Sequence, residues 1–289
     1  DVLSYEVMNR LPRMIVFILL VTLGTEALGA ALMYGAWQGD YTSGQRLYLS
    51  VFHAVSAYCN AGFSLLGDNL TGYRGSITVV GTITGLIVFG GIGFTVQGEL
   101  MDRLSYILKP RAKFRGRLLK NLAAVKGQSR ISLHTKVVLI TTGLLLFCGA
   151  VLFGMCEWSG VLSGEPLKTK VLASWFQSVT PRTAGFNTVD FSMLRLPTLL
   201  LLMALMFIGA SPGGTGGGIK TSTFAVIIAT VRATLKNRIN VEMLKRSIPI
   251  QTIRQSLAVV LLAMLLVIVA TAVLSVSDRQ QGLDQVVGV

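Results

Sequence analysis

The sequence predicts an all-α polytopic membrane protein built from repeated membrane–pore–membrane units with re-entrant helices. Three observations support this fold class. Only 13% of the 289 residues are charged, whereas a soluble domain carries about 25%. Several apolar runs are long enough to cross a bilayer, and one short motif occurs twice in the same surroundings. Lipid is therefore the expected solvent for most of the chain.

Five apolar runs are the predicted membrane spans, and they cover residues 14–39, 77–98, 137–156, 196–219 and 255–277. Each run has at least the roughly 20 residues that cross a hydrocarbon core. Glu26 is the only acidic residue within them. An intramembrane carboxylate is a candidate for function, but its place near one end of its run favours a structural hydrogen bond.

The basic residues predict the topology. Most of the 26 Lys and Arg residues lie in two segments between spans, residues 102–136 and 232–254. Because cytoplasmic loops are enriched in Lys and Arg, these two segments are predicted to be cytoplasmic, in a multi-pass protein of the cell membrane. Topology accounts for the net charge of +13, so no nucleic-acid partner is expected.

An internal repeat places a short segment between each pair of spans. Residues 51–64 and 175–187 are similar and contain Asn-Ala-Gly-Phe and Thr-Ala-Gly-Phe. The short helices expected at 46–57 and 168–180 cannot cross a bilayer, so we predict that they are re-entrant from the outer side. The predicted divisions are repeats at 1–128 and 129–250, followed by the first helix of an incomplete repeat at 251–289.

The two glycine motifs suit the binding of a monovalent cation. Backbone that is not helical is tolerated at membrane depth only where it is buried or lines a cavity, and its carbonyls can replace the hydration shell of an ion. Glycine permits the positive φ that turns successive carbonyls to one side. The predicted filter residues are Asn60, Ala61, Gly62, Phe63, Thr183, Ala184, Gly185 and Phe186.

Residues next to these motifs have further predicted roles. Phe63 and Phe186 are expected to wedge their loops against neighbouring helices. Asp68 and Asp190 follow the two motifs, and they either raise the cation concentration at an outer mouth or are ordinary solvated loop carboxylates. The three cysteines show no metal-ligand spacing, so no resident metal or bound cofactor is expected.

A glycine-rich segment, residues 209–218, interrupts the fourth predicted span. It consists of Gly209, Ala210, Ser211, Pro212, Gly213, Gly214, Thr215, Gly216, Gly217 and Gly218. Glycine costs about 1 kcal/mol and proline about 3 kcal/mol in a helix interior, so the helix should break here. The segment is interpreted as a movable gate, with a static kink as the alternative. A phosphate-binding loop is rejected because Ile219 separates Gly218 from Lys220.

Residues 90–93 are the weaker counterpart of this segment in the first repeat, and they are interpreted as a close helix-packing surface.

The two glycine motifs and the stretch 209–221 together resemble the Trk/Ktr/HKT superfamily of potassium transporters, above all its bacterial Ktr-type membrane subunits. The resemblance implies four membrane–pore–membrane repeats around one pseudo-fourfold pore, as in potassium channels. This chain resembles the second and third repeats and the start of the fourth. Two filter motifs cannot close a fourfold ring, so a truncated chain is expected, with a two-repeat protein that dimerises around its pore as the alternative.

The same resemblance implies the function and the partners. Glycine at both filter positions favours K⁺, and residues 209–218 match the gating loop of the family. A homodimer on a cytoplasmic RCK-type nucleotide-binding subunit is implied, with the basic loops contacting that subunit or anionic lipid. The predicted function is K⁺ uptake, and Na⁺ or mixed cation transport and a non-conducting scaffold or sensor are the alternatives.

An intramembrane hydrolase is the alternative from another functional class. Re-entrant loops also occur in such enzymes, but neither Ser56 nor Ser64 has a base that the sequence reveals. His53 is interpreted as structural. No enzyme activity is therefore predicted.

Overall fold

The computed structural model describes residues 2–108, 131–238, 240–244 and 246–287. The chain forms two compact units, Asp1–Ser222 and Thr223–Val289, which are described separately. Most of the basic segment predicted at 102–136 lies outside the described residues.

The first repeat occupies the first half of the larger unit. It consists of a long helix α1 (Val2–Met33), a short helix α2 (Ser43–Tyr58), a turn of 3₁₀ helix (Thr71–Tyr73) and a helix α3 (Ile77–Gly91). Helix α2 begins with a capping box, in which the Thr42 hydroxyl accepts a hydrogen bond from the Gln45 amide and the Gln45 side chain accepts one from the Thr42 amide. The predicted short helix at 46–57 is confirmed.

The first return span is not continuous. Helix α3 and the next helix, α4 (Phe94–Leu108), meet at an angle of 106°. Gly93 lies between them with a φ of +89°, a conformation that glycine adopts without steric cost. The stretch predicted as a span over 77–98 is therefore broken, because α3 ends at Gly91 and α4 begins at Phe94.

The second repeat has the same order of elements. Helix α6 (Leu133–Glu157) is followed by the short helix α7 (Leu167–Val179), a 3₁₀ turn (Phe191–Met193) and helix α8 (Leu196–Phe207). The helix α9 (Thr221–Leu235) begins only after the glycine-rich segment. The predicted break at 209–218 is thus confirmed.

The smaller unit contains most of α9, a hairpin and a long helix. Strands β1 (Glu242–Met243) and β2 (Arg246–Ser247) pair antiparallel, and α10 (Ile250–Val287) follows. Within the described residues, three stretches are long and apolar enough to span a membrane, namely Met14–Met33, Leu133–Glu157 and Ile250–Val276, and the bent pair α3–α4 would be a fourth. The predicted divisions at 128 and 250 stay predictions.

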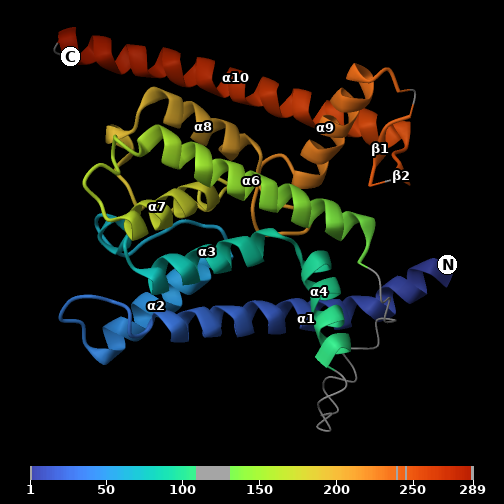
Figure 1. Ribbon diagram of the computed structural model, residues 1–289, viewed down its shortest axis with the longest axis horizontal. Coiled ribbons are helices and arrows are strands. Elements are labelled where there is room, and N and C mark those ends of the chain that lie inside the picture. Colours follow the sequence, from blue (N-terminus) through green and yellow to red (C-terminus); the bar gives the residue numbers. More distant parts are fainter. Residues whose placement is uncertain (1, 109–130, 239, 245, 288–289) are drawn as a thin grey trace. The chain divides into compact units, whose positions relative to one another are not determined.

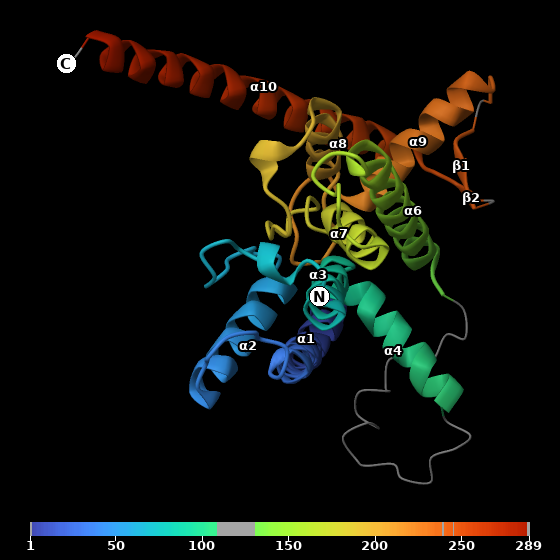
Figure 2. The same cartoon turned by 60° about the vertical axis from the view of Figure 1, so that its left-hand side comes forward.

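The two repeats of the larger unit share a core. Helix α3 lies beside α7 in both views (Figure 1, Figure 2). One apolar cluster joins Leu86 of α3 to Phe176 and Val179 of α7, all of them buried. This packing places the ends of the two short helices next to each other.

Candidate functional site

The loops that follow α2 and α7 have the same unusual backbone. In the first glycine loop, residues 60–63, φ is +53° at Asn60 and +74° at Gly62. In the second glycine loop, residues 183–186, φ is +72° at Thr183 and +85° at Gly185. Positive φ is uncommon outside glycine. The sequence predicted it at the glycines and missed it at Asn60 and Thr183.

The two glycine loops touch at their glycines. A Cβ atom on Gly62 would lie 2.6 Å from the Cα of Gly185, and one on Gly185 would lie 3.2 Å from the Cα of Gly62. Any side chain at position 62 would therefore overlap the opposite backbone. Glycine is required there both by its φ and by this close approach.

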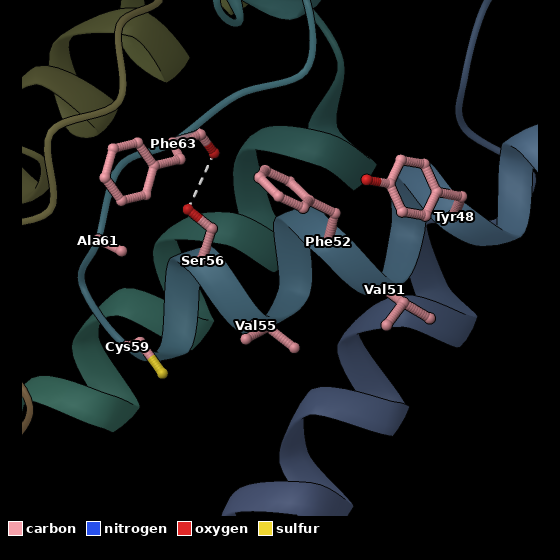
Figure 3. Close-up of a pocket in the computed structure, with 8 residues that line it drawn as sticks. All are labelled: Tyr48, Val51, Phe52, Val55, Ser56, Cys59, Ala61 and Phe63. Carbon is pink, nitrogen blue, oxygen red and sulfur yellow. Dashed lines mark hydrogen bonds between the residues drawn. The ribbon is translucent and has the colours of Figure 1, made fainter.

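Each glycine loop is also tied to its own short helix by a hydroxyl group. The Ser56 hydroxyl donates to the carbonyl of Phe63 at 2.9 Å, as Figure 3 shows, and the Thr180 hydroxyl donates to the carbonyl of Phe186 at 2.6 Å. These bonds occupy equivalent positions in the two repeats. They fix the end of each loop relative to the helix before it.

A further contact between the short helix and the chain after its loop lies one turn earlier in each repeat. His53 Nε2 is 3.1 Å from Ser64 Oγ, and His53 Nδ1 is 2.8 Å from the carbonyl oxygen of Leu49. In the second repeat, Gln177 Nε2 donates to the Thr188 hydroxyl at 3.3 Å. The sequence does not reveal this neighbour of Ser64, because the contact forms only when the loop folds back onto the helix that carries His53.

The two phenylalanines differ in their surroundings. Phe186 is fully buried and stacks with His53, with ring centroids 6.3 Å apart. Phe63 is 69% exposed. The predicted wedge is confirmed for Phe186 and wrong for Phe63. An open pocket of about 340 Å³ lies beside Phe63, lined by residues of α2 and of the first glycine loop (Figure 3).

The glycine-rich segment forms a closed loop that returns to its own starting point. The Gly209 amide donates to the Ile219 carbonyl at 3.0 Å, and the Ala210 amide donates to the Gly217 carbonyl at 3.0 Å. These bonds satisfy backbone groups that the interrupted helix leaves unpaired.

This loop packs on the break between α3 and α4. The amides of Ser211 and Thr215 donate to the carbonyls of Gly91 and Gly90, at 2.9 and 3.1 Å. The amide of Phe94 donates to the Gly213 carbonyl at 3.0 Å. The interpretation of residues 90–93 as a close-packing surface holds, with the C-terminal end of α2 at Tyr58 and the glycine-rich segment as its partners.

The glycine-rich segment also contacts both glycine loops. The Asn60 amide group donates to the Thr215 hydroxyl at 2.7 Å, and the Gly217 amide donates to the Thr183 hydroxyl at 3.1 Å. The Lys220 ammonium group donates to the Gly216 carbonyl at 2.7 Å. The three motifs that the sequence singled out therefore form one cluster in the structure.

The acidic candidates lie in turns outside the spans. Asp68 accepts a hydrogen bond from the Thr71 hydroxyl at 2.6 Å, and Asp190 accepts one from the Ser192 hydroxyl at 2.7 Å. These bonds hold the pKa of both carboxyl groups below the usual aspartate value. Each aspartate thus has a structural role in its turn. Glu26 contacts the Cys59 thiol at 4.0 Å.

Two charged residues, one shortly after α7 and one at the end of α6, are buried. Arg182, just before the second glycine loop, is 5% exposed, and its Nε and Nη1 atoms have no hydrogen-bond partner among the described residues. Glu157 is fully buried and accepts hydrogen bonds from the Thr198 hydroxyl and the Arg195 amide. Charge counting cannot distinguish such residues from solvated ones.

Long apolar helices, short helices between them and paired glycine loops define a polytopic membrane protein of the re-entrant-helix class. The chain matches the TrkH family, described as cation transport proteins, over residues 1–284. It belongs to this family, and it is therefore a membrane protein.

Three similar proteins are named for ion uptake. The Ktr system potassium uptake protein B of Vibrio alginolyticus is 35% identical over 250 residues, covering 86% of this chain and 50% of that protein. The protein of the same name from Bacillus subtilis is 37% identical, covering 79% and 47%. The potassium/sodium uptake protein NtpJ of Enterococcus hirae is 33% identical, covering 86% and 50%. The chain thus spans about half the length of these relatives.

A solved structure has a similar fold. The potassium transporter TrkH from Vibrio parahaemolyticus matches with a TM-score of 0.62 at 18% identity, over 86% of this chain and 47% of that one. This likeness supports the all-α transporter fold.

Proposed function

We propose that the protein takes up K⁺ across the cell membrane along a path lined by carbonyls of the two glycine loops. The observation that carries this proposal is the contact between two loops of identical backbone type, each at the C-terminal end of a short helix. Helix C-termini carry partial negative charge, and backbone carbonyls replace the water around an ion. Further loops of the same kind would complete the ring.

Potassium is favoured over sodium by the glycine at both positions 62 and 185, following the family resemblance. The names of the Ktr relatives refer to potassium. The name of the Enterococcus relative refers to potassium and sodium, so mixed K⁺ and Na⁺ transport is the alternative. In both cases the cation is the substrate and not a resident cofactor.

The glycine-rich segment is proposed as the gate of this path. It contacts both glycine loops through Asn60 and Thr183. A segment without regular helix can change its conformation at lower cost than the flanking helices. It is therefore placed to open and close the path next to the ion-binding carbonyls.

We further propose that the basic segments 102–136 and 232–254 face the cytoplasm, where they bind an RCK-type nucleotide-binding subunit or anionic lipid. The positive-inside rule supports this orientation. The glycine loops then face outward, with Asp68 and Asp190 attracting cations to the mouth. A homodimer of the membrane subunit is proposed on the family resemblance alone.

Uptake of ⁸⁶Rb⁺ by purified protein in proteoliposomes tests the function. The variant with Gly62→Ser and Gly185→Ser should lower the preference for K⁺ over Na⁺ about tenfold or more, which corresponds to about 1.4 kcal/mol. Gly81→Ala and Gly143→Ala are matched controls, because a Cβ at either position meets no other atom within 4 Å. Unchanged uptake rate and selectivity in the double variant would refute the assignment of the filter. Absence of cation flux in the wild type would favour a scaffold or sensor.

The contact between His53 and Ser64 supports a hydrolase as a second candidate function. A serine hydroxyl next to a histidine is the arrangement of an activated nucleophile. However, the second repeat has Gln177 at the position of His53, where it bonds to the hydroxyl of Thr188, and an amide cannot act as a base. Covalent labelling of Ser64 by a fluorophosphonate, abolished in His53→Gln, would support the hydrolase. We expect no labelling.

A further inference from the structure

We propose that Thr215 is a positioning residue that couples the glycine-rich segment to the first glycine loop, so that the segment cannot leave without loosening the loop. This inference rests on the proposed function, in which the segment is the gate and the loop binds the ion. It assigns the mechanical connection between them to one side chain.

Within the described part of the chain, Thr215 makes three hydrogen bonds, and all of them go to the first repeat. Its hydroxyl donates to the carbonyl of Tyr58 at 2.8 Å and accepts from the Asn60 amide group at 2.7 Å. Its backbone amide donates to the carbonyl of Gly90 at 3.1 Å. Tyr58 is the last residue of α2, and Asn60 is the first residue of the first glycine loop. The hydroxyl thus bridges the junction at which the loop begins.

The bond to Asn60 acts on a residue with a strained backbone. A residue other than glycine with positive φ costs of order 1–3 kcal/mol and persists only where its surroundings hold it. Asn60 has a φ of +53° and is buried. Its side chain is held by Thr215, and its Oδ1 atom has no partner among the described residues. Loss of the Thr215 hydroxyl therefore removes the hydrogen bond of the Asn60 side chain and leaves the backbone bond from the Asn60 amide to the Ala57 carbonyl.

The second glycine loop has a weaker connection to the same segment. The Thr183 hydroxyl accepts one hydrogen bond, from the Gly217 amide at 3.1 Å. A Cβ on Gly216 would lie 2.6 Å from the Thr183 hydroxyl oxygen, so the segment is closely packed there. Thr183 contacts only the segment backbone, whereas Thr215 reaches both a side chain and a helix end. The coupling should therefore be stronger to the first loop than to the second.

Coupling of this kind is reciprocal. A cation that stabilises the first glycine loop in its present conformation also keeps Asn60 in place to hold Thr215. Binding of K⁺ should then favour the docked segment, and release of the segment should weaken binding of K⁺ at the loop.

Hydrogen–deuterium exchange of the protein in lipid nanodiscs tests the coupling without any need for transport. Thr215→Val removes the hydroxyl and keeps the shape, whereas Thr215→Ser keeps the hydroxyl. Thr84→Val is the matched control, because Thr84 is 3% exposed and its hydroxyl bonds only within α3. We expect Thr215→Val to raise exchange about tenfold in residues 209–218 and in residues 60–63. Thr215→Ser and Thr84→Val should stay within about threefold of the wild type.

Thr183→Val loosens the segment from its other contact and leaves the bonds of Thr215 in place. It should raise exchange in residues 209–218, and exchange in residues 60–63 should rise with it, so it serves as a second probe of the coupling if Thr215→Val does not fold. Exchange that rises in Thr215→Val only within 209–218 would overturn the coupling, and so would a rise in Thr183→Val that is confined to residues 209–218. In proteoliposomes, Thr215→Val should increase ⁸⁶Rb⁺ leak. Absence of flux in the wild type would refute the proposed function and leave the exchange result standing.

Discussion

The two repeats carry the same kind of glycine loop after the same kind of short helix. The side chains at two equivalent positions are nevertheless buried in the second repeat and exposed in the first. In the second repeat, Val179 and Phe186 are fully buried. In the first, the equivalent Val55 and Phe63 are 40% and 69% exposed. The cover of the second repeat is the first, because α3 packs on α7.

This difference separates the loop geometry, which each repeat forms by itself, from the burial of its side chains, which depends on a neighbouring repeat. The positive φ values and the hydroxyl bonds to the phenylalanine carbonyls occur in both repeats. Full burial of the equivalent valine and phenylalanine side chains occurs only in the second repeat, where the first repeat lies against them. The local pattern therefore specifies the shape of the loop, and assembly specifies its environment.

The largest expected effect that tests this comparison comes from truncating the two phenylalanines. Phe186→Ala should destabilise the protein by about 3–5 kcal/mol, because it opens a cavity in the shared core. Phe63→Ala should cost less than about 1 kcal/mol, because most of its side chain lies outside that core. Thermal unfolding in detergent measures both. Equal losses would show that the face beside Phe63 is also covered in the purified protein.

An intermediate effect is expected at the histidine contact. His53→Gln copies Gln177 of the second repeat, which bonds to Thr188. It should cost about 1 kcal/mol or less and preserve ⁸⁶Rb⁺ uptake, whereas His53→Leu should cost about 1–3 kcal/mol, since it leaves the Leu49 carbonyl or the Ser64 hydroxyl without its partner. Loss of uptake in His53→Gln with normal thermal stability would contradict the equivalence of the two repeats here.

The smallest effect is expected from the two aspartates. Because the pKa of Asp68 and of Asp190 is lowered in the folded protein, their contribution to stability is present above the ordinary aspartate pKa of about 3.9. It is lost only as the pH falls through the lowered values. Uptake measured between pH 6 and pH 8 should therefore show no titration of either group.

A salt series separates the structural role of these aspartates from a role at the mouth. If Asp68→Asn and Asp190→Asn slow uptake at low ionic strength and not at high, the carboxylates attract cations by charge. If uptake is slowed equally at both, the turns matter instead, and the proposed mouth role fails.

The sequence was sufficient wherever the cause is local. Six glycines and a proline break a helix in any context, and the break after Phe207 followed directly from composition. The glycines at 62 and 185 predicted their own φ. The short helices followed from length and from the repeated motif.

The features that the sequence missed depend on distant partners. Asn60, which has a positive φ, bonds through its side chain to Thr215, a residue far away in the chain. The bend after Gly91 is occupied by residues 211–215 of the other repeat. A count of charges along the sequence places Arg182 in a loop. Only the packing of the second repeat shows that its side chain is buried. The roles assigned to the filter residues, the gate and the acids stay predictions, because geometry alone shows contact and not conduction.

The break in the second span of each repeat has a different structural role in the two repeats. In the first repeat the break is short, and the carbonyls of Gly90 and Gly91 accept hydrogen bonds. In the second repeat the break is long, and it forms the glycine-rich segment whose amides donate those bonds. A bulky residue at Gly90 would overlap the Tyr58 carbonyl. It would disturb the surface on which the glycine-rich segment packs, without changing the sequence of the segment itself. With the glycine-rich segment as the proposed gate, such a variant is expected to close poorly, although the altered position lies in the other repeat.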